Sequence, residues 1–391
     1  MGHSNKAERQ AAEAPAYVDP TTGETYPISE PRWRSSTGAP LMITPLPGMG
    51  RDMIDNSKRS LWRYAAALPL DVRDPITMGE GSTPLVSVKW RGADAHFKLE
   101  WFAPTGSFKD RGASVMLSIL RQQGLTRLLE DSSGNGGAAI AAYAAAGAMK
   151  AKILAPASTG PGKLAQMRAY GAEVELIAGT RQDTADAAMR EGATIFYASH
   201  NWHAFFLQGT KTIAYELWED LGFKAPDNVV IPTGAGSNVL GCDIGFSELL
   251  RRGEIAALPR LFAAQPENCA PLHASFMAGS GDLITVEIRQ TIAEGAIARP
   301  VRAREVLAAV RRSRGATIAV SESEIVAALI GLAHVGLYVE PTSAVAAAAL
   351  TKLFESGVVR PGETTVALLT GAGLKATDKI GDIIGGSRRR E

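Results

Sequence analysis

The chain has 391 residues, of which 46% are hydrophobic, and its formal net charge is +1. This length is enough for two domains with separate cores, and the small net charge argues against a nucleic-acid or anionic-membrane partner. The chain has only two cysteines, and their spacing is not that of a metal site. It has no signal-peptide pattern in Met1–Gln10 and no apolar run long enough to span a membrane. These features predict a soluble cytoplasmic protein, and the terminal run "SRRRE" is interpreted as a solvated tail.

Residues 1–60 are rich in Pro, Gly, Ser and Thr and are expected to form an irregular N-terminal arm. Beyond them, strands and helices alternate. Strands are predicted at 96–100, 126–131, 151–156, 172–177, 194–199, 228–234, 260–265 and 364–373; helices are predicted at 108–123, 136–147, 161–171, 181–191, 237–251 and 340–357, and a strand running into a helix at 317–333. Such alternation is typical of βαβ units and parallel sheets. We therefore expect an α/β fold with a large domain from 61–111 and 204–391, and a small domain, 112–203, inserted into it.

The stretch "PTGSFKDRG" places Lys109 at the start of a helix, directly after a Gly- and Ser-rich turn. The partial positive charge of a helix N-terminus disfavours an ammonium group, and Arg111 would add to this effect if it lay nearby. Lys109 is therefore a candidate amine for reaction with a carbonyl group. The alternative is a solvated lysine in a first helical turn, which is the commoner role.

A second turn, "DSSGNGG", follows a predicted strand and opens a helix, at the sheet edge where parallel sheets bind ligands. Free N–H groups at a helix start bind carboxylate or phosphate, and Ser132, Ser133 and Asn135 add side-chain donors around Gly134. Ordinary helix capping needs one such residue and does not explain the whole cluster.

Two further turns complete the set. The stretch "PTGAGSN" contains a run of small residues, Gly234, Ala235, Gly236, Ser237 and Asn238. Such residues let backbone N–H groups close around a phosphate, although a tight strand-to-helix turn explains the same pattern. In "LLTGAGLK", Thr370 ends a buried strand and would point its hydroxyl group toward the cleft. One ligand would use all four turns, because pyridoxal 5′-phosphate has an aldehyde for a lysine, a phosphate and a ring nitrogen that needs a partner.

In this order, the four motifs resemble those of the fold type II pyridoxal-phosphate enzymes, and in particular the threonine synthases. The segments "SLWRYAAALPL" and "GEGSTPLV" extend the resemblance, which runs from Trp62 to Lys375. It implies two parallel-sheet domains of tryptophan-synthase-β-like architecture, with the cofactor in the cleft between them. It also implies a homodimer.

The resemblance further implies roles for individual residues. Lys109 would form the Schiff base with the cofactor and then move substrate protons, with Phe108 beside it. Asn135 would bind the 3-oxygen of the ring, and the loop from Ser132 to Asn135 would hold the substrate carboxylate. The cofactor phosphate would lie on Gly234, Ala235, Gly236, Ser237 and Asn238, and the pyridine nitrogen would meet Thr370. Glu340 matches a position that is often acidic, although a carboxylate at a helix N-terminus explains it equally well.

The sequence departs from the family pattern in two places. Residues 18–41 match a region where many threonine synthases carry cysteines but contain none, so no structural zinc is expected. Bacterial threonine synthases also use an Asn and an Arg to bind the substrate phosphate, and this region here reads "ASHNWHAFFLQGTKT", with Phe205 and Phe206. Candidate replacements are the cations Lys163, Arg168 and Lys211; His200 and His203 could contact the substrate, although packing is the commoner role.

Four functions follow from these residues. The leading hypothesis is a threonine synthase-like lyase that converts O-phosphohomoserine to threonine. The alternative is an ammonia-lyase or dehydratase that converts a β-substituted amino acid such as serine or threonine to a 2-oxo acid, which needs no second phosphate site. A non-catalytic binding protein is disfavoured because Lys109 is retained, and a dinucleotide-binding protein because G-x-G-x-x-G with a downstream acid is missing.

Overall fold

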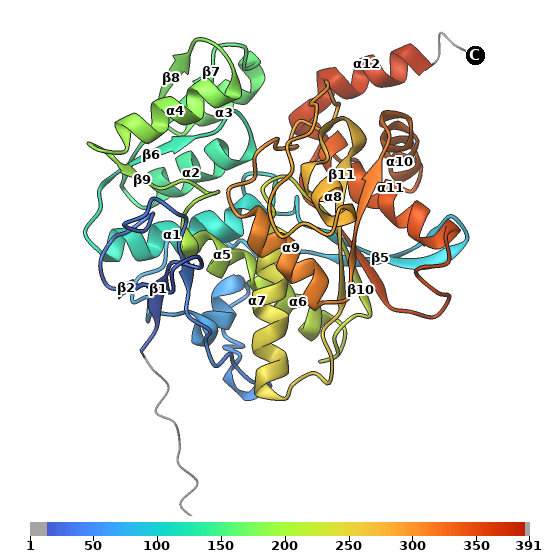
Figure 1. The fold of residues 1–391 in the computed structure, drawn as a ribbon, viewed down its shortest axis with the longest axis horizontal. Helices are drawn as coiled ribbons and strands as arrows, with labels where there is room; N and C mark the ends of the chain where they lie inside the picture. Colours follow the sequence, from blue (N-terminus) through green and yellow to red (C-terminus); the bar gives the residue numbers. More distant parts are fainter. Residues whose placement is uncertain (1–13, 388–391) are drawn as a thin grey trace, which may run out of the picture.

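The computed structural model describes residues 14–387, so the segment Met1–Gln10 and the basic end of the chain from Arg388 lie outside the described residues. Two sheets of mainly parallel strands dominate the fold (Figure 1). The larger sheet has the strand order β12-β11-β10-β13-β5-β4, formed by Ala316–Val320, Arg260–Pro266, Asn228–Pro232, Thr365–Leu369, Ala93–Leu99 and Leu85–Trp90. The smaller has the order β8-β7-β6-β9, formed by Glu173–Ile177, Lys150–Pro156, Arg127–Asp131 and Phe196–Tyr197. This confirms the predicted α/β class.

One strand of the larger sheet runs against the others. β4 pairs with β5 in antiparallel register, because the two are joined by a tight turn at Arg91 and Gly92. Both turn residues have positive φ (50° and 84°), as a two-residue hairpin requires. The other neighbouring pairs in the two sheets are parallel.

The N-terminal arm is more regular than expected. Its described part contains a three-stranded antiparallel sheet, formed by β1 (Ala16–Val18), β2 (Thr25–Pro27) and β3 (Met42–Ile43). These strands are two or three residues long, which is too short to leave an alternating hydrophobic pattern in the sequence. Tyr17 on β1 is fully buried and packs against Phe205, so the arm is part of the core.

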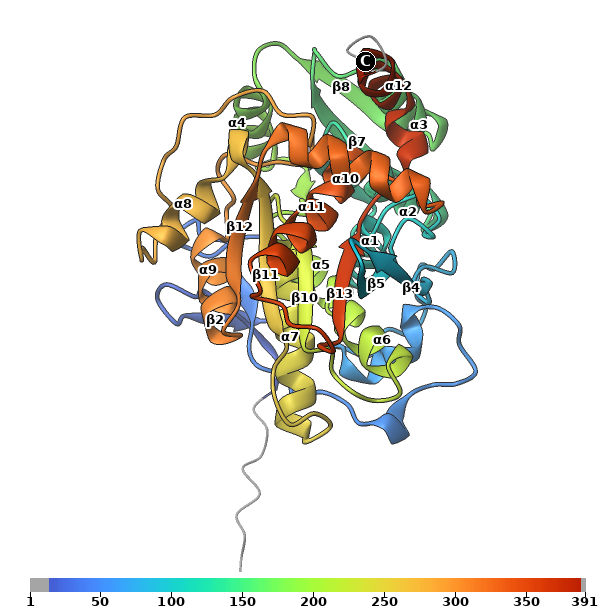
Figure 2. The same ribbon diagram turned by 90° about the vertical axis from the view of Figure 1, so that its right-hand side faces the viewer.

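Helices cover both faces of the larger sheet (Figure 2). α6 (Thr212–Asp220), α7 (Ser237–Arg252) and α9 (Ala303–Arg312) pack on one face, while α10 (Glu322–His334) and α11 (Pro341–Glu355) pack on the other. On β13, Val366 and Leu368 join the first core, and Ala367 and Leu369 join the second. This alternation explains why the strand reads as a continuous apolar run.

Around the smaller sheet lie α2 (Asn135–Ala146), α3 (Pro161–Ala169) and α4 (Arg181–Glu191). α1 (Lys109–Gln122) packs closely on α5 (Ala204–Thr210) because glycines face the contact. A Cβ on Gly112 would lie 2.4 Å from the Phe206 ring, and one on Gly209 would lie 2.1 Å from the backbone oxygen of Arg111. α8 (Pro271–Met277) and α12 (Thr377–Ser387) complete the α-helices of residues 14–387, and none of these helices is long and apolar enough to cross a membrane.

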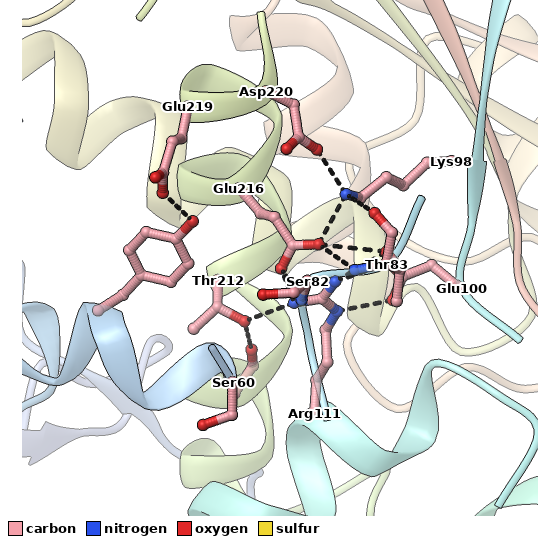
Figure 3. Close-up of polar contacts among 12 residues, drawn as sticks. Ser60, Ser82, Thr83, Lys98, Glu100, Arg111, Thr212, Glu216, Glu219 and Asp220 are labelled. Carbon is pink, nitrogen blue, oxygen red and sulfur yellow. Dashed lines mark hydrogen bonds and ion pairs between the residues drawn. The ribbon is translucent and has the colours of Figure 1, made fainter. Parts of the chain in front are cut away.

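A buried ionic network joins α1 and α6 to the end of β5 in the larger sheet (Figure 3). The guanidinium of Arg111 donates from Nε and Nη2 to the carboxylate of Glu100, both at 2.7 Å, and from Nη1 to Glu216 at 2.8 Å. The ammonium of Lys98 lies 2.6 Å from both Glu216 and Asp220. Burial raises the pKa of Glu216, but the charges of Arg111 and Lys98 outweigh it and hold that pKa below its ordinary value.

We expect Arg111→Met to lower the free energy of unfolding by about 3–5 kcal/mol, because it leaves the buried Glu100 without a cation and Glu216 with Lys98 alone. Urea denaturation measures this change. Arg121→Met is the matched control, since Arg121 lies on the same helix but pairs with the exposed Asp74, and its effect should stay below about 1 kcal/mol. Equal losses in the two variants would contradict the structural role of the network.

Candidate active site

A cavity of about 350 Å³ lies where loops from both sheets meet. Every site residue predicted from the sequence lines it: Phe108, Lys109, Ser132, Ser133, Gly134, Asn135, Gly234, Ala235, Gly236, Ser237, Asn238 and Thr370. The loops follow β6, β10 and β13, at the carboxyl ends of parallel strands. The structure therefore brings all four motifs to one place.

Backbone hydrogen bonds fix Lys109 opposite Thr370. The N–H of Phe108 donates to the carbonyl of Thr370 at 3.0 Å, and the N–H of Ala372 donates to Gly106 at 3.0 Å. Gly106 turns the chain with φ of +83°, which favours glycine. Asp110 then accepts the N–H of Thr105 at 2.7 Å and closes the turn in front of α1.

The amine of Lys109 has no hydrogen bond or ion pair with any residue that the structure describes. Its Nζ lies 4.7 Å from the centre of the Phe108 ring and 5.6 Å from that of Phe206. Burial lowers the pKa of Lys109 to about 8, against the opposing charges of Glu130 and Glu340. The neighbouring Arg111 pairs with Glu100 and Glu216. Burial, and not the charge of Arg111 as expected from the sequence, therefore lowers the pKa of Lys109.

The loop from Ser132 to Asn135 leads into the N-terminus of α2. Asn135 donates from Nδ2 to both carboxylate oxygens of Glu340, each at 3.1 Å, across the cavity. Burial raises the pKa of Glu340. The free N–H groups of the first turn of α2 are available to a carboxylate, as the sequence predicts.

The loop from Gly234 to Asn238 is built for close approach. A Cβ on Gly234 would lie 2.1 Å from the carbonyl oxygen of Gly295, and Gly236 has φ of +89°. The side chain of Asn238 is buried, yet neither its oxygen nor its nitrogen has a hydrogen-bond partner in the described part of the chain. A backbone cradle beside an unsatisfied amide fits an anionic group such as phosphate.

Thr370 ends β13 with its hydroxyl group 3.2 Å from the hydroxyl of Ser343. Ser343 in turn accepts the N–H of Gly371 at 2.8 Å. Thr370 therefore presents an uncharged hydroxyl group to the cavity. Ser343, at the start of α11, fixes the orientation of this hydroxyl group.

The cations considered for a substrate phosphate lie in different surroundings. Lys211 is fully buried and pairs with Glu248 at 2.8 Å, while Arg168 is exposed and does not line the cavity. Lys163 does line it and pairs with Glu294. Phe205 and Phe206 are fully buried in the core of the smaller sheet, so α5 presents no cation to the cavity.

The two histidines differ as well. His203 is the N-cap of α5 and accepts the N–H of Phe205 at 3.2 Å, so it has a packing role. His200 lines the cavity and contacts Glu130. Sequence reasoning missed Glu130, although an acidic residue in the buried strand "RLLED" was a usable signal. It also missed the loop 292–297 and Lys375, whose positions depend on long-range folding.

A family model described as "Pyridoxal-phosphate dependent enzyme" matches residues 76–371. The chain belongs to this family. It is 35% identical to a threonine synthase from Methanosarcina acetivorans over 334 residues, which are 83% of this chain and 82% of that protein. It is 34% identical to a threonine synthase from Methanocaldococcus jannaschii, over 91% of this chain and 92% of that protein. The protein is thus a pyridoxal-phosphate-dependent lyase that resembles threonine synthase.

Solved structures share its fold type II architecture. A fungal L-serine ammonia-lyase from Rhizomucor miehei superposes with a TM-score of 0.69 at 23% identity, covering 78% of this chain and 98% of that one. Maize serine racemase superposes with a TM-score of 0.66 at 22% identity, covering 79% and 93%. The residues in the cavity fit the cofactor, because a free amine, an anion cradle and a neutral hydroxyl group line one space of suitable size.

We expect the rate at which the apoprotein takes up pyridoxal phosphate to rise with pH through about 8, because only the neutral amine of Lys109 is nucleophilic. Stopped-flow absorbance measures this rate. Glu340→Gln should move the midpoint to lower pH, since it removes a negative charge that favours the ammonium. Lys109→Ala, the control, should bind without the covalent spectral change, and a midpoint near the ordinary 10.5 would contradict the assignment.

Gly234→Ala should weaken pyridoxal phosphate binding by about 10- to 100-fold, because the new Cβ would collide with the backbone carbonyl of Gly295. Equilibrium dialysis of the apoprotein gives both dissociation constants. Gly162→Ala is the control, since a Cβ there meets no atom within 4 Å. Unchanged affinity in Gly234→Ala would mean that the cradle does not hold the cofactor.

Proposed function

We propose that this enzyme catalyses α,β-elimination from a small amino acid with an unphosphorylated leaving group at Cβ, and that ammonia and a 2-oxo acid are the products. The observation that carries the proposal is the segment with Phe205 and Phe206, the region where the resemblance leads us to expect a phosphate-binding arginine, because it offers no cation to the cavity. The ring of Phe206 is fully buried against Gly112 and supplies no donor. Phosphate recognition needs charge-assisted donors.

The charges of the cavity support the same conclusion. Apart from Lys109, three cationic side chains among the described residues line it, and each already has a partner. Arg181 lies 2.6 Å from Asp131, Lys163 pairs with Glu294, and Lys375 donates at 2.7 Å to Gln166. Two of the three are thus neutralised by a carboxylate, and only Lys375, whose partners Gln166 and the Thr105 carbonyl are uncharged, is left without an ion pair among the described residues.

The residues of this chain would divide the reaction as follows. When bound, pyridoxal phosphate supplies an electron sink for the Cα of an amino acid joined to it. The loop from Ser132 to Asn135 holds the substrate carboxylate, and Lys109 removes the proton from Cα. Thr370 faces the ring nitrogen with a neutral group. The Cβ substituent then departs with its bonding electrons, and hydrolysis of the released product gives the 2-oxo acid and ammonia.

A second candidate is the conversion of O-phosphohomoserine to threonine. Identities of 34–35% to threonine synthases over most of the chain favour it. Lys163 is the cation that would take the substrate phosphate, after leaving Glu294.

Incubation of the holoenzyme with L-serine, other β-substituted amino acids and O-phosphohomoserine separates the two candidates. We expect ammonia and a 2-oxo acid in equal amounts from a β-substituted amino acid with one amino group, and no phosphate from O-phosphohomoserine. Lys109→Ala should reduce the rate at least about 1000-fold, since it removes the base. Phosphate release together with threonine would establish the synthase reaction instead.

Three further expectations stay predictions. They are the homodimer, the cytoplasmic location, and the division into an arm, 1–60, a large domain, 61–111 with 204–391, and a small domain, 112–203. The grouping of β6, β7, β8 and β9 in one sheet supports the last of these.

A further inference from the structure

Glu130 and His200 form a buried pair beside Lys109. One carboxylate oxygen of Glu130 lies 2.9 Å from Nδ1 of His200, and the other accepts the backbone N–H of His200 at 3.0 Å. Glu130 is fully buried at the end of β6, and His200 is 8% exposed. Both contacts come from one carboxylate, so the position and the rotation of the imidazole are fixed together.

The ring of His200 lies between Gly136 and Phe206. A Cβ on Gly136 would lie 2.5 Å from Cε1 of the ring, so glycine leaves the space that the ring fills. The Phe206 ring meets it from another side, with centres 5.8 Å apart and planes at 62°. His200 also lines the cavity, and its Nε2 has no hydrogen-bond partner among residues 14–387, since its ring bonds only through Nδ1.

The charge of the pair decides what it can bind. Burial and the charge of Lys109 lower the pKa of His200, against the effect of Glu130. A neutral ring that donates its Nδ1–H to the carboxylate keeps a lone pair on Nε2. The pair then carries one negative charge and offers an acceptor, which suits a cation and repels a phosphate.

The place of the pair indicates which part of the substrate it meets. His200 adjoins Gly136, next to the proposed carboxylate loop, and lies within electrostatic range of Lys109. A substrate whose carboxylate lies on that loop and whose nitrogen is joined to the cofactor at Lys109 has its Cβ close to both groups. The substituent on Cβ is therefore the part that faces His200.

We propose that the substrate is a 2,3-diamino acid and that Nε2 of His200 accepts a hydrogen bond from the ammonium group on its Cβ. Glu130 is then the positioning residue that orients His200. This proposal rests on the elimination activity proposed above. An ammonium group needs no acid to depart, because the Cβ–N bond breaks with its electrons going to nitrogen and ammonia leaves. Hydroxide would need a proton from another group, since His200 as an acceptor cannot give one. For 2,3-diaminopropionate, one water is consumed and pyruvate and two ammonia molecules are formed.

The kinetic test compares L-2,3-diaminopropionate with β-chloro-L-alanine, whose leaving group has no donor. We expect His200→Asn to lower kcat/KM for the diamino acid by about 10- to 100-fold and to change that for the chloro compound by less than about threefold. Glu130→Gln should act in the same direction. His203→Asn is the matched control, because asparagine retains the N-cap function and His203 does not line the cavity.

The outcomes separate the two proposals. If the wild type releases pyruvate from serine or the chloro compound but not from the diamino acid, elimination stands and the role of His200 is overturned. Equal losses on both substrates in His200→Asn would also overturn it. If no β-substituted amino acid gives a 2-oxo acid, the proposed function itself fails.

A spectroscopic measurement on the apoprotein tests the pair without turnover. In ¹⁵N-histidine-labelled protein, the signal that disappears in His200→Asn should show a protonated Nδ1 and an unprotonated Nε2. Glu130→Gln should remove this preference while the melting temperature stays within a few degrees. A protonated Nε2 in the wild type would contradict the acceptor role.

Discussion

The position of Lys109 depends on an arginine two residues away. Arg111 fixes the first turn of α1 by binding Glu100 beyond β5 and Glu216 on α6 at the same time. Because the end of β5, α1 and α6 meet at one guanidinium, although Glu216 lies 105 positions from Arg111, a shift of any of these elements would move Lys109. Burial makes the arrangement costly to break, since each charge relies on the others in place of water.

Each residue of the run "KDRG" has a separate role at the start of α1. Lys109 supplies the amine, Asp110 holds Thr105, Arg111 carries the network and Gly112 leaves room for Phe206. Burial raises the pKa of Asp110 to about 7, against its hydrogen bonds from Thr105. Four consecutive residues thus face four different surroundings, as one turn of helix allows.

The sequence predicted most of the fold because buried parallel strands and amphipathic helices leave periodic patterns. It also predicted the residues that line the site, since Gly- and Ser-rich turns after strands are local signals. It missed β4, whose direction is set by a two-residue turn, the short strands of the arm, and the helices α5, α6, α8 and α9. It could not place Arg111 with Glu216 or His200 with Glu130, because these contacts join residues 105 and 70 positions apart. It also attributed the lowered pKa of Lys109 to the helix terminus and Arg111, whereas burial is the main cause.

Glu294 lies on the loop that contacts Gly234, and it pairs with Lys163 on α3 and with Lys379 on α12. These contacts tie the helices of the smaller sheet to the C-terminal end of the chain. Because exposed ion pairs contribute at most about 1 kcal/mol each, they hold α3 and α12 to this loop only weakly. Dissolved salt screens such pairs, so we expect this link between α3 and α12 to weaken as the ionic strength rises.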